Sequence, residues 1–376
     1  MSAAGRRYAD LGPGDPAPWF TQRSSRNPAY CFDTVAGRYV VLCFMASSTE
    51  PRSQRALQAV LAERHRFDDE RACFFGVTLD PADAAPGRLT EQLPGVRFIF
   101  DFDWAVGRLY GAVPADGGPG DGPVAAHRFW LVLDPNLRVM ARFGFGIGDD
   151  GGAMAVLDYL SRLPPPERST GMETPPPVLV VPDVFDKGFC NRLVTLHDAA
   201  GGIESGFMRD VDGKTTLLHD PGHKRRRDWT VDDAALKSQV KARLARCVAP
   251  EIRKVHHFEA TRVERYLVAC YDAEAGGHFR PHRDNTTKGT AHRRFAVSIN
   301  LNDDFDGGEL SFPEYSPRGF KAPAGAAVVF SGSLLHAVSK VTAGRRYAFL
   351  PFLYDEAAAA QREANIGFLP GGSYRA

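Results

Sequence analysis

The sequence has few cysteines, almost no net charge and no long apolar run. Its six cysteines are scattered through 376 residues without a Cys-x-x-Cys pair, so we expect reduced, structural thiols in a cytoplasmic protein. The 46 basic and 45 acidic residues nearly cancel, which argues against nucleic-acid or anionic-membrane partners. No apolar run reaches transmembrane length, and residues 1–20 lack the apolar core of a signal peptide.

Two triple-proline runs mark the clearest boundary in the chain. They flank the polar residues of "LPPPERSTGMETPPP" and favour an extended, semi-rigid spacer, because proline cannot continue a helix or a central strand. A chain of this length suits two domains. We therefore predict a first domain over residues 1–163, a linker over 164–177 and a second domain over 178–376.

Strand-like and helix-like segments alternate in the first domain. Short apolar runs predict strands over 38–45, 72–79, 96–100, 127–134 and 138–145. Helices are expected after Pro51, with Thr49 or Ser48 as N-cap, and then after Pro81, over 103–113 and over about 150–162. Interleaved strands and helices that close with a hairpin predict an α/β sandwich.

Four segments of this domain resemble the peroxiredoxin branch of the thioredoxin fold: "GDPAPWF", the strand after Gly37, "DWAVGRLYGAV" and "HRFWLVLDPNLRV". The resemblance covers about residues 8–163. Thr49 and Arg128 match family positions, but the place of the peroxidatic cysteine falls on Arg52. Peroxide reduction needs a thiolate, and Cys43 lies within a strand where packing is expected. We therefore predict a thioredoxin-like domain without the chemistry, which acts as a scaffold or docks a partner or a second subunit.

The second domain opens with helices and continues with short strands. A strand leads into a helix over 177–200, and a second helix is expected over about 232–249. From Ala260 onward the pattern changes to short strands separated by Gly, Pro, Asn and Asp. This order predicts a double-stranded β-helix, or jelly roll, with supporting helices. The chain should thus join an α/β domain to an α+β domain.

Two histidines and one aspartate in the second domain form a candidate metal site. His282 and Asp284 are two residues apart, and in a strand such side chains point the same way. His336 follows a glycine-containing turn in a separate strand. Two imidazoles and one carboxylate leave about three coordination positions open, as in ferrous oxygenases, whereas structural zinc more often takes four protein ligands including thiolate.

Arg346 indicates the ligand that would accompany the metal. It follows His336 by ten residues on the next expected strand, while strand alternation sends Arg345 to the opposite face. A planar guanidinium matches the distal carboxylate of 2-oxoglutarate. A surface arginine on a strand edge is the alternative interpretation.

Three segments of this domain resemble the prolyl 4-hydroxylase type of 2-oxoglutarate/Fe(II) oxygenases: "YDAEAGGHFRPHRD", "RFAVSINLNDDFDGGELSFPE" and "APAGAAVVFSGSLLHAVSKVTAGRRYAF". The resemblance spans about residues 178–356 and implies Fe(2+), 2-oxoglutarate and, as a candidate reductant, L-ascorbate. The residues it implies are His282, Asp284 and His336 for iron, and Arg346, Tyr271 and Asn300 for 2-oxoglutarate. Halogenating relatives carry a small residue in place of the carboxylate, so Asp284 favours hydroxylation.

The expected reaction is hydroxylation of a C–H bond, with succinate and CO2 as co-products. The resemblance favours a prolyl or other amino-acid residue of a peptide or protein as substrate, and a free amino acid or a small metabolite stays open as the alternative. One alternative is a thiol-redox protein, which Arg52 opposes, and another is a non-catalytic docking protein, which the intact triad and Arg346 oppose. The basic run Lys224–Arg227 is predicted as a solvated loop, with recognition of an acidic substrate as its alternative.

Overall fold

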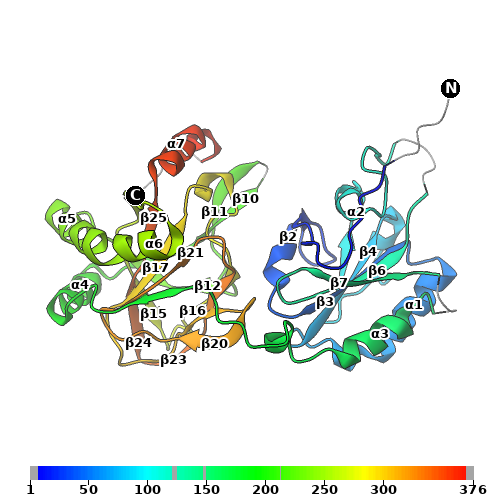
Figure 1. Ribbon diagram of the computed structural model, residues 1–376, viewed down its shortest axis with the longest axis horizontal. Coiled ribbons are helices and arrows are strands. Elements are labelled where there is room, and N and C mark those ends of the chain that lie inside the picture. Colours follow the sequence, from blue (N-terminus) through cyan, green and yellow to red (C-terminus); the bar gives the residue numbers. More distant parts are fainter. Residues whose placement is uncertain (1–6, 121–124, 147–149, 212, 370–376) are drawn as a thin grey trace. The chain divides into compact units, whose positions relative to one another are not determined.

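The computed structural model describes residues 7–120, 125–146, 150–211 and 213–369 (Figure 1). The chain divides into two compact units, one formed by Met1–Pro175 with Pro313–Ser316 and the other by Pro176–Phe312 with Pro317–Ala376. Both units combine helices with β-sheets, as the sequence predicts. Among the described residues, no helix has both the length and the apolar character needed to cross a bilayer.

A five-stranded sheet forms the centre of the first unit, in the order β5-β4-β3-β6-β7. The first three of these strands are parallel, whereas β6 and β7 run antiparallel. The described elements are β1 (Thr21–Gln22), β2 (Tyr30–Cys31), η1 (Phe32–Val35), β3 (Tyr39–Ala46), α1 (Pro51–Ala62), η2 (Arg64–Arg66), β4 (Ala72–Thr78), η3 (Pro81–Ala84), β5 (Val96–Phe100), α2 (Ala105–Tyr110), β6 (Phe129–Leu133), β7 (Val139–Gly144), α3 (Ala153–Arg162) and η4 (Pro166–Arg168).

Alternation along β3 places side chains in two cores. Val41 and Cys43 pack with apolar residues of α1 and α3 on one face of the sheet. On the other face Phe44 contacts Tyr110 of α2, with ring centroids 5.3 Å apart. Figure 1 shows α1 and α3 together on one side of this sheet and α2 on the other. Helices on both faces explain why the central strand is a continuous apolar run.

The N-cap of α1 differs from the sequence prediction. Glu50 occupies the cap, and its carboxylate accepts a hydrogen bond of 3.0 Å from the backbone N–H of Ser53. The predicted cap Ser48 instead donates its hydroxyl to Asp83 at 2.5 Å. A carboxylate at this position also interacts favourably with the helix dipole.

The start of the predicted linker is attached to the first unit. The hydroxyl of Tyr39 donates to the carbonyl of Pro164 at 3.0 Å, and Arg71 donates to the carbonyl of Leu163 at 2.6 Å. Pro166–Arg168 then forms a single 3-10 turn, because proline is compatible with the first position of a helix. The expectation of a uniformly extended spacer is therefore wrong for this turn.

Two sheets make up most of the second unit. The larger has the order β14-β25-β17-β24-β15-β13-β9, with β21 and β8 added beside β17, and the smaller has the order β12-β16-β22-β19-β20. The described elements are β8 (Leu179–Val181), α4 (Lys187–Ala200), β9 (Ile203–Glu204), β10 (Phe207–Val211), β11 (Lys214–Leu218), β12 (Lys224–Arg225), β13 (Arg227–Thr230), α5 (Ala234–Arg243), the π-turn η5 (Leu244–Val248), α6 (Ala249–His256), β14 (Arg262–Glu264), β15 (Leu267–Asp272), β16 (His278–His282), η6 (Lys288–Thr290), β17 (Phe295–Asn300), β18 (Asp306–Gly307), β19 (Leu310–Phe312), β20 (Ser316–Phe320), β21 (Ala327–Ser331), β22 (His336–Val338), β23 (Val341–Ala343), β24 (Arg345–Phe349), β25 (Phe352–Tyr354), α7 (Glu356–Ala364) and η7 (Ile366–Phe368).

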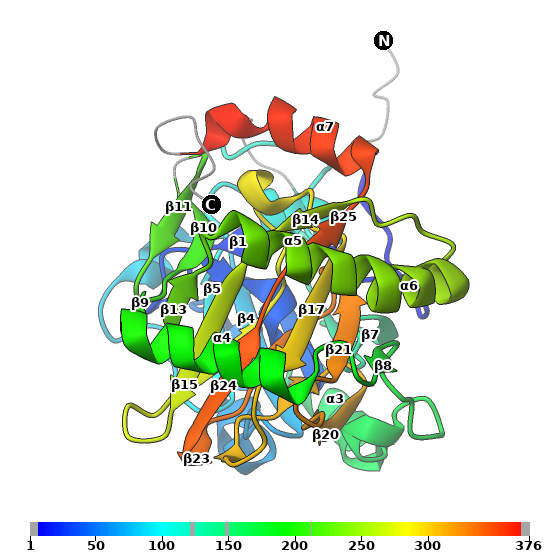
Figure 2. The same ribbon diagram turned by 90° about the vertical axis from the view of Figure 1, so that its left-hand side faces the viewer.

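The larger sheet has one face covered by helices. Figure 2 shows α4, α5 and α6 lying across β15, β24, β17 and β21. Leu193 of α4 and Val240 of α5 are fully buried there with Ile299 and Phe349 of the sheet. Because side chains alternate along a strand, the neighbours of these core residues point to the opposite face. That face carries the polar residues described below.

Several elements of the second unit were not predicted, among them the strands between residues 203 and 230 and the helix α7. Residues 207–218 form the hairpin β10-β11 between the two predicted helices, where no strand was expected. Residues 356–364 form α7, which begins with Asp355 as its N-cap. The predicted helix over 232–249 is longer than expected, because the π-turn η5 joins α5 to α6 and the helical path continues to His256.

Candidate functional site

His282, Asp284 and His336 lie together in the second unit. Their nitrogen and oxygen ligand atoms are all within 4.8 Å of one another. Nε2 of His282 is 3.7 Å from one carboxylate oxygen of Asp284, and Nε2 of His336 is 3.4 Å from the other. A single ion with ligands about 2.1 Å away can bridge such separations. All three side chains are largely buried.

Strand pairing places the two imidazoles opposite each other. His282 on β16 is the direct cross-strand partner of His336 on β22, and their ring centroids are 4.2 Å apart. The register shifts between Phe279 and His282, which is a β-bulge. The extra residue turns Phe279 to the side of His282, and the two rings stack at 3.5 Å. Asp284 follows the strand, held by its backbone N–H, which donates to the carbonyl of Gly332 at 2.9 Å.

Backbone carbonyls orient both imidazoles. Nδ1 of His282 lies 2.8 Å from the carbonyl of Arg280, and Nδ1 of His336 lies 3.0 Å from the carbonyl of Leu334. A carbonyl oxygen only accepts, so each Nδ1 carries a proton and each ring directs Nε2 toward the cluster. Burial, together with the nearby His336, lowers the pKa of His282 well below its usual value. His282 is therefore presented to the cluster as a neutral ligand, and the carbonyls orient both rings.

Arg346 is buried on the inner face of β24. Its Nε donates to Oδ1 of Asn300 at 3.0 Å, and its Nη2 donates to the hydroxyl of Ser298 at 2.9 Å. Nη1 is buried and, within the described part of the chain, has no hydrogen-bond partner. Burial lowers the pKa of Arg346, as does the charge of Arg226, while Tyr271 opposes the shift. The surface-arginine alternative is wrong, because only 2% of this residue is exposed.

Tyr271 and Asn300 both lie beside Arg346. Tyr271 is the cross-strand partner of Arg346 on β15, and the guanidinium stands 5.4 Å from the centre of its ring. Asn300 uses Nδ2 to donate to the carbonyl of Ala322 at 2.7 Å and Oδ1 to accept from Arg346. Its amide thus holds Arg346 in place, a role that the sequence does not reveal. Whether either residue contacts a co-substrate stays a prediction.

The run Lys224–Arg227 is not a solvated loop, and that prediction is wrong. The run belongs to β12 and β13, so its side chains alternate: Lys224 and Arg226 are buried, with 4% and 6% exposed, whereas Arg225 and Arg227 face solvent. Nζ of Lys224 donates to the hydroxyl of Ser205 at 2.7 Å. Burial and the charge of Arg226 lower the pKa of Lys224, while Asp228 and Asp284 oppose the shift.

Arg226 forms a buried ion pair with Asp228. Nε and Nη2 of the arginine donate to the two carboxylate oxygens at 2.6 and 2.7 Å. Burial alone would raise the pKa of Asp228, but the charges of Arg226 and Lys224 lower it to about 2. The third nitrogen of Arg226, Nη1, donates to the hydroxyl of Tyr271 at 3.2 Å. A charged network therefore reaches from Asp228 to the residues around Arg346.

The first unit has a basic cavity at the position where the peroxiredoxin resemblance places its chemistry. The cavity measures about 450 Å³, and its lining includes Arg52, His127, Arg128 and Arg142. It contains no thiol, and Cys43 is fully buried in β3, where burial raises its pKa well above the usual value. A protonated, inaccessible thiol is a poor nucleophile.

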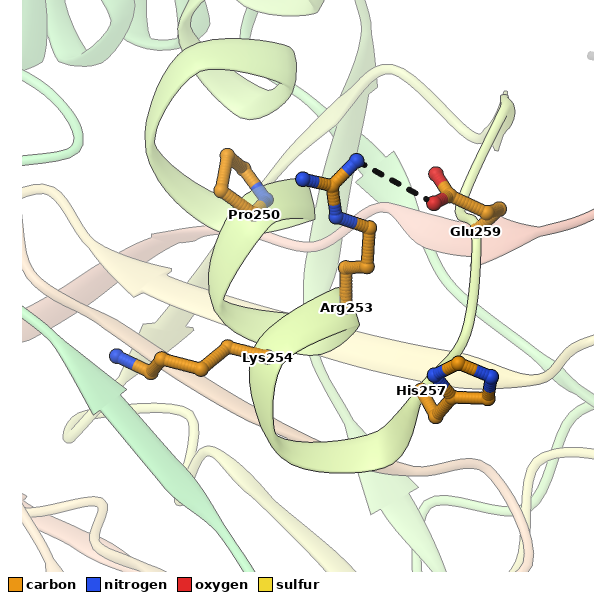
Figure 3. A pocket seen from close by; sticks show the side chains of 5 residues that line it. All are labelled: Pro250, Arg253, Lys254, His257 and Glu259. Carbon is orange, nitrogen blue, oxygen red and sulfur yellow. Dashed lines mark hydrogen bonds and ion pairs between the residues drawn. The ribbon is translucent and has the colours of Figure 1, made fainter.

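A further hollow of about 470 Å³ lies on the second unit, beside the end of α6 (Figure 3). Its lining residues are Pro250, Arg253, Lys254, His257 and Glu259. Arg253 and Glu259 form an ion pair of 3.5 Å with both side chains largely exposed. The metal-type cluster does not line this hollow, and solvent-exposed pairs of this kind contribute little energy.

Comparison with known proteins gives a family match in the C-terminal part of the chain. Residues 266–354 match the family model described as the 2OG-Fe(II) oxygenase superfamily. A PKHD-type hydroxylase of Synechococcus sp. is 33% identical over 93 residues, which cover 23% of this chain and 41% of that protein. A PKHD-type hydroxylase of Xanthomonas axonopodis pv. citri is 26% identical over 183 residues, which cover 46% of this chain and 75% of that protein.

Two solved structures each align with part of the chain. A prolyl hydroxylase of Trichoplax adhaerens, in complex with a peptide fragment of hypoxia inducible factor, aligns with a TM-score of 0.39 and 16% identity, over 55% of this chain and 94% of that chain. Peroxidoxin BcpB of Mycobacterium tuberculosis aligns with a TM-score of 0.35 and 18% identity, over 41% of this chain and 99% of that chain. From the match of residues 266–354, the C-terminal region of this chain contains a 2OG-Fe(II) oxygenase domain.

Proposed function

We propose that this chain is an Fe(II)- and 2-oxoglutarate-dependent dioxygenase that hydroxylates a C–H bond of a prolyl or other amino-acid residue. The observation that carries the proposal is the assembly of His282, Asp284 and His336 in the same unit as a buried arginine that no carboxylate neutralises among the described residues. We further propose that this unit is a double-stranded β-helix. Its two sheets approach each other at the cluster, where the ring centroids of Phe330 on β21 and His336 on β22 are 4.7 Å apart.

The donor set fits Fe(II). Two imidazoles and one carboxylate offer three ligands and leave other positions open, which is the pattern of non-haem ferrous oxygenases. The hydrogen bonds from each Nδ1 to a carbonyl fix the orientation of the rings before any ion arrives. No cysteine is part of the cluster, so the set lacks the thiolate typical of structural zinc.

The surroundings of Arg346 fit 2-oxoglutarate. A guanidinium that is buried without a carboxylate is unfavourable, and a bound anion would remove that penalty. Nη1 of Arg346 is the donor left for such an anion, while Asn300 and Ser298 hold the other two nitrogens. The planar fork matches a carboxylate better than it matches a single-atom anion.

Bound Fe(II), 2-oxoglutarate and O2 would supply the oxidising chemistry: one oxygen atom of O2 enters succinate as the keto acid loses CO2, and the other becomes the hydroxyl group of the substrate. His282, Asp284 and His336 hold the metal, and Arg346 fixes the far end of the keto acid. The rings of Phe279 and Phe330 pack against the two histidines and limit water around them. L-ascorbate stays a proposed reductant.

For the first unit we propose a thioredoxin-like domain that lacks peroxidase activity and docks a partner or a second subunit. Its parallel and antiparallel strand order β5-β4-β3-β6-β7 supports the fold. Arg52 lies at the basic cavity, where the resemblance would place a cysteine. The carboxylate of Glu50 already occupies the N-terminus of α1, which is the natural site for a helix-stabilised anion.

The proposal is tested by anaerobic titration of the full chain with Fe(II) and 2-oxoglutarate. We expect a weak visible charge-transfer band in the wild type and its loss in His282→Ala and Asp284→Ala, because two remaining ligands hold Fe(II) poorly. His278→Ala is the matched control, since His278 lies on the same strand but outside the cluster. An unchanged band in either ligand variant would refute the assignment.

The substrate class is tested separately. Peptides and free amino acids are incubated with the loaded enzyme, and products are screened for a mass gain of one oxygen atom that depends on 2-oxoglutarate. Modification of prolyl peptides supports the proposal as stated. Modification of free amino acids alone would contradict the peptide or protein substrate.

A further inference from the structure

The hydroxyl of Tyr271 has its direction fixed by a neighbouring cation. Nη1 of Arg226 donates to this oxygen at 3.2 Å, and a guanidinium has no acceptor. The tyrosine oxygen must therefore accept from Arg226, and its own proton is left to donate elsewhere. Among the described residues, this hydroxyl has no other hydrogen-bond partner. Tyr271 is 1% exposed, so bulk water is a poor alternative acceptor.

Arg226 is itself held rigidly. Two of its nitrogens bind Asp228 in the bidentate geometry, and Nη2 also lies 3.4 Å from the hydroxyl of Ser205. The carboxylate of Asp228 provides the opposite charge to Arg226 within the buried network. Burial alone would lower the pKa of Arg226, but the charge of Asp228 raises it. The guanidinium is therefore permanently charged and always available as a donor to Tyr271.

The ring of Tyr271 lies between two guanidinium groups. The centre of the Arg226 guanidinium is 5.6 Å from the ring centroid, and that of Arg346 is 5.4 Å away. Two donors thus remain for a ligand beside this ring, the hydroxyl proton of Tyr271 and Nη1 of Arg346. Both are donors, which selects an anionic acceptor.

We propose that Arg226 is a positioning residue that makes Tyr271 an obligatory hydrogen-bond donor to the distal carboxylate of 2-oxoglutarate at Arg346. This inference rests on the proposed function of the site. Arg226 acts through Tyr271 and needs no contact with the co-substrate. By donating to the phenol oxygen it also polarises the O–H bond, which strengthens the bond that Tyr271 makes.

The expected effects follow from the strength of hydrogen bonds to charged groups. Loss of the Tyr271 hydroxyl in Tyr271→Phe should weaken 2-oxoglutarate binding about tenfold or more. Loss of Arg226 leaves the hydroxyl in place but removes its orientation and polarisation, so we expect about a three- to tenfold weakening. In the Y271F background, loss of Arg226 should have almost no further effect.

The experiment is a double-mutant cycle on the full chain. Arg226→Gln is combined with Asp228→Asn, because Arg226→Gln alone would remove the bidentate partner of a buried carboxylate and leave it Arg265 at 3.6 Å as its nearest ion pair. The dissociation constant of 2-oxoglutarate is measured anaerobically with Fe(II) by calorimetry for the wild type, R226Q/D228N, Y271F and the triple variant. Arg227→Gln is the matched control, because Arg227 is the exposed neighbour that donates only to backbone carbonyls of Gly201 and Gly202.

Fe(II) affinity, measured in the same samples, shows whether each variant is folded, since the metal ligands lie outside this network. Arg226→Lys, which keeps the charge beside Asp228 but not the planar fork, serves as a second variant and should also weaken 2-oxoglutarate binding. The inference is overturned if R226Q/D228N binds 2-oxoglutarate as the wild type does. It is also overturned if the dissociation constant of the triple variant is raised by the full product of the two separate fold-changes, those of R226Q/D228N and of Y271F. If the wild type itself binds no 2-oxoglutarate, the proposed function fails as well.

Discussion

Replacement of Arg346 should weaken the binding of 2-oxoglutarate without lowering the stability of the ligand-free protein. In Arg346→Gln the amide can still donate to Asn300 or Ser298, while the buried charge disappears. Removal of a buried charge without a carboxylate partner is favourable, and it offsets the lost hydrogen bonds of about 1 kcal/mol each. We therefore expect the unfolding midpoint of the ligand-free variant to be unchanged or higher than that of the wild type.

The same change should abolish stabilisation by 2-oxoglutarate. Loss of one partner from a buried charge pair costs about 3–5 kcal/mol, which raises the dissociation constant by at least about 100-fold. At a concentration 100 times the wild-type constant, the ligand stabilises the wild type by about 2.7 kcal/mol and the variant by about 0.4 kcal/mol or less. For a unit of this size the midpoint then rises by about 5–10 °C in the wild type and by about 1–2 °C in the variant.

The assay is thermal unfolding of the Fe(II)-loaded protein under anaerobic conditions, with and without 2-oxoglutarate. Arg345→Gln is the control, since Arg345 is adjacent but exposed and pairs with Asp272 at the surface. A variant R346Q that is stabilised as strongly as the wild type would refute the role of Arg346. A large drop in its ligand-free midpoint would refute the argument that the buried charge is unfavourable.

Three other predictions concern the rest of the molecule. Asp228→Ala should destabilise the protein by about 3–5 kcal/mol in urea unfolding, because it leaves Arg226 buried and unpaired, and R226Q/D228N should recover much of that loss. His223 has its pKa lowered to about 4 by burial and by the charge of Arg209, so the unfolded state takes up a proton first as pH falls. Stability should therefore be fully present above about pH 6.5 and decline toward pH 4, and His223→Gln should flatten that decline in urea titrations at several pH values. Cys43→Ser should consume peroxide no more slowly than the wild type does, because the buried thiol is not expected to react. The same change should destabilise the protein by about 1–3 kcal/mol, because it buries a hydroxyl group. Faster peroxide consumption by the wild type than by the variant would contradict the first expectation.

The metal-type cluster could be predicted because strand geometry acts over short distances. His282 and Asp284 are two residues apart, and His336 lies in a strand that antiparallel pairing brings beside them. Arg346 follows from the same alternation, which turns Arg345 outward. Both predictions need only the two-residue alternation of side chains along a strand and the pairing of β16 with β22.

The buried network around Arg226 could not be predicted in the same way. Charged runs are usually solvated, and only tertiary pairing of β12 with β16 and of β13 with β15 buries every second residue of this one. All four residues of the run are basic, so the sequence shows no alternation of apolar and polar residues that would mark a strand. The role of Asn300 depends on Ala322, which is 22 residues away and whose carbonyl fixes the amide. Such long-range partners leave no local pattern.

The ladder between β16 and β22 has a consequence for how this centre can fail. Its two rings face each other in only one register of the two strands, and a slip of β22 by one residue would turn His336 to the opposite face of the sheet. An insertion or deletion in the connection between β21 and β22 should accordingly abolish metal binding completely and not weaken it gradually. A bound iron ion, held by a ligand from each strand, would in turn stabilise the register of β16 and β22.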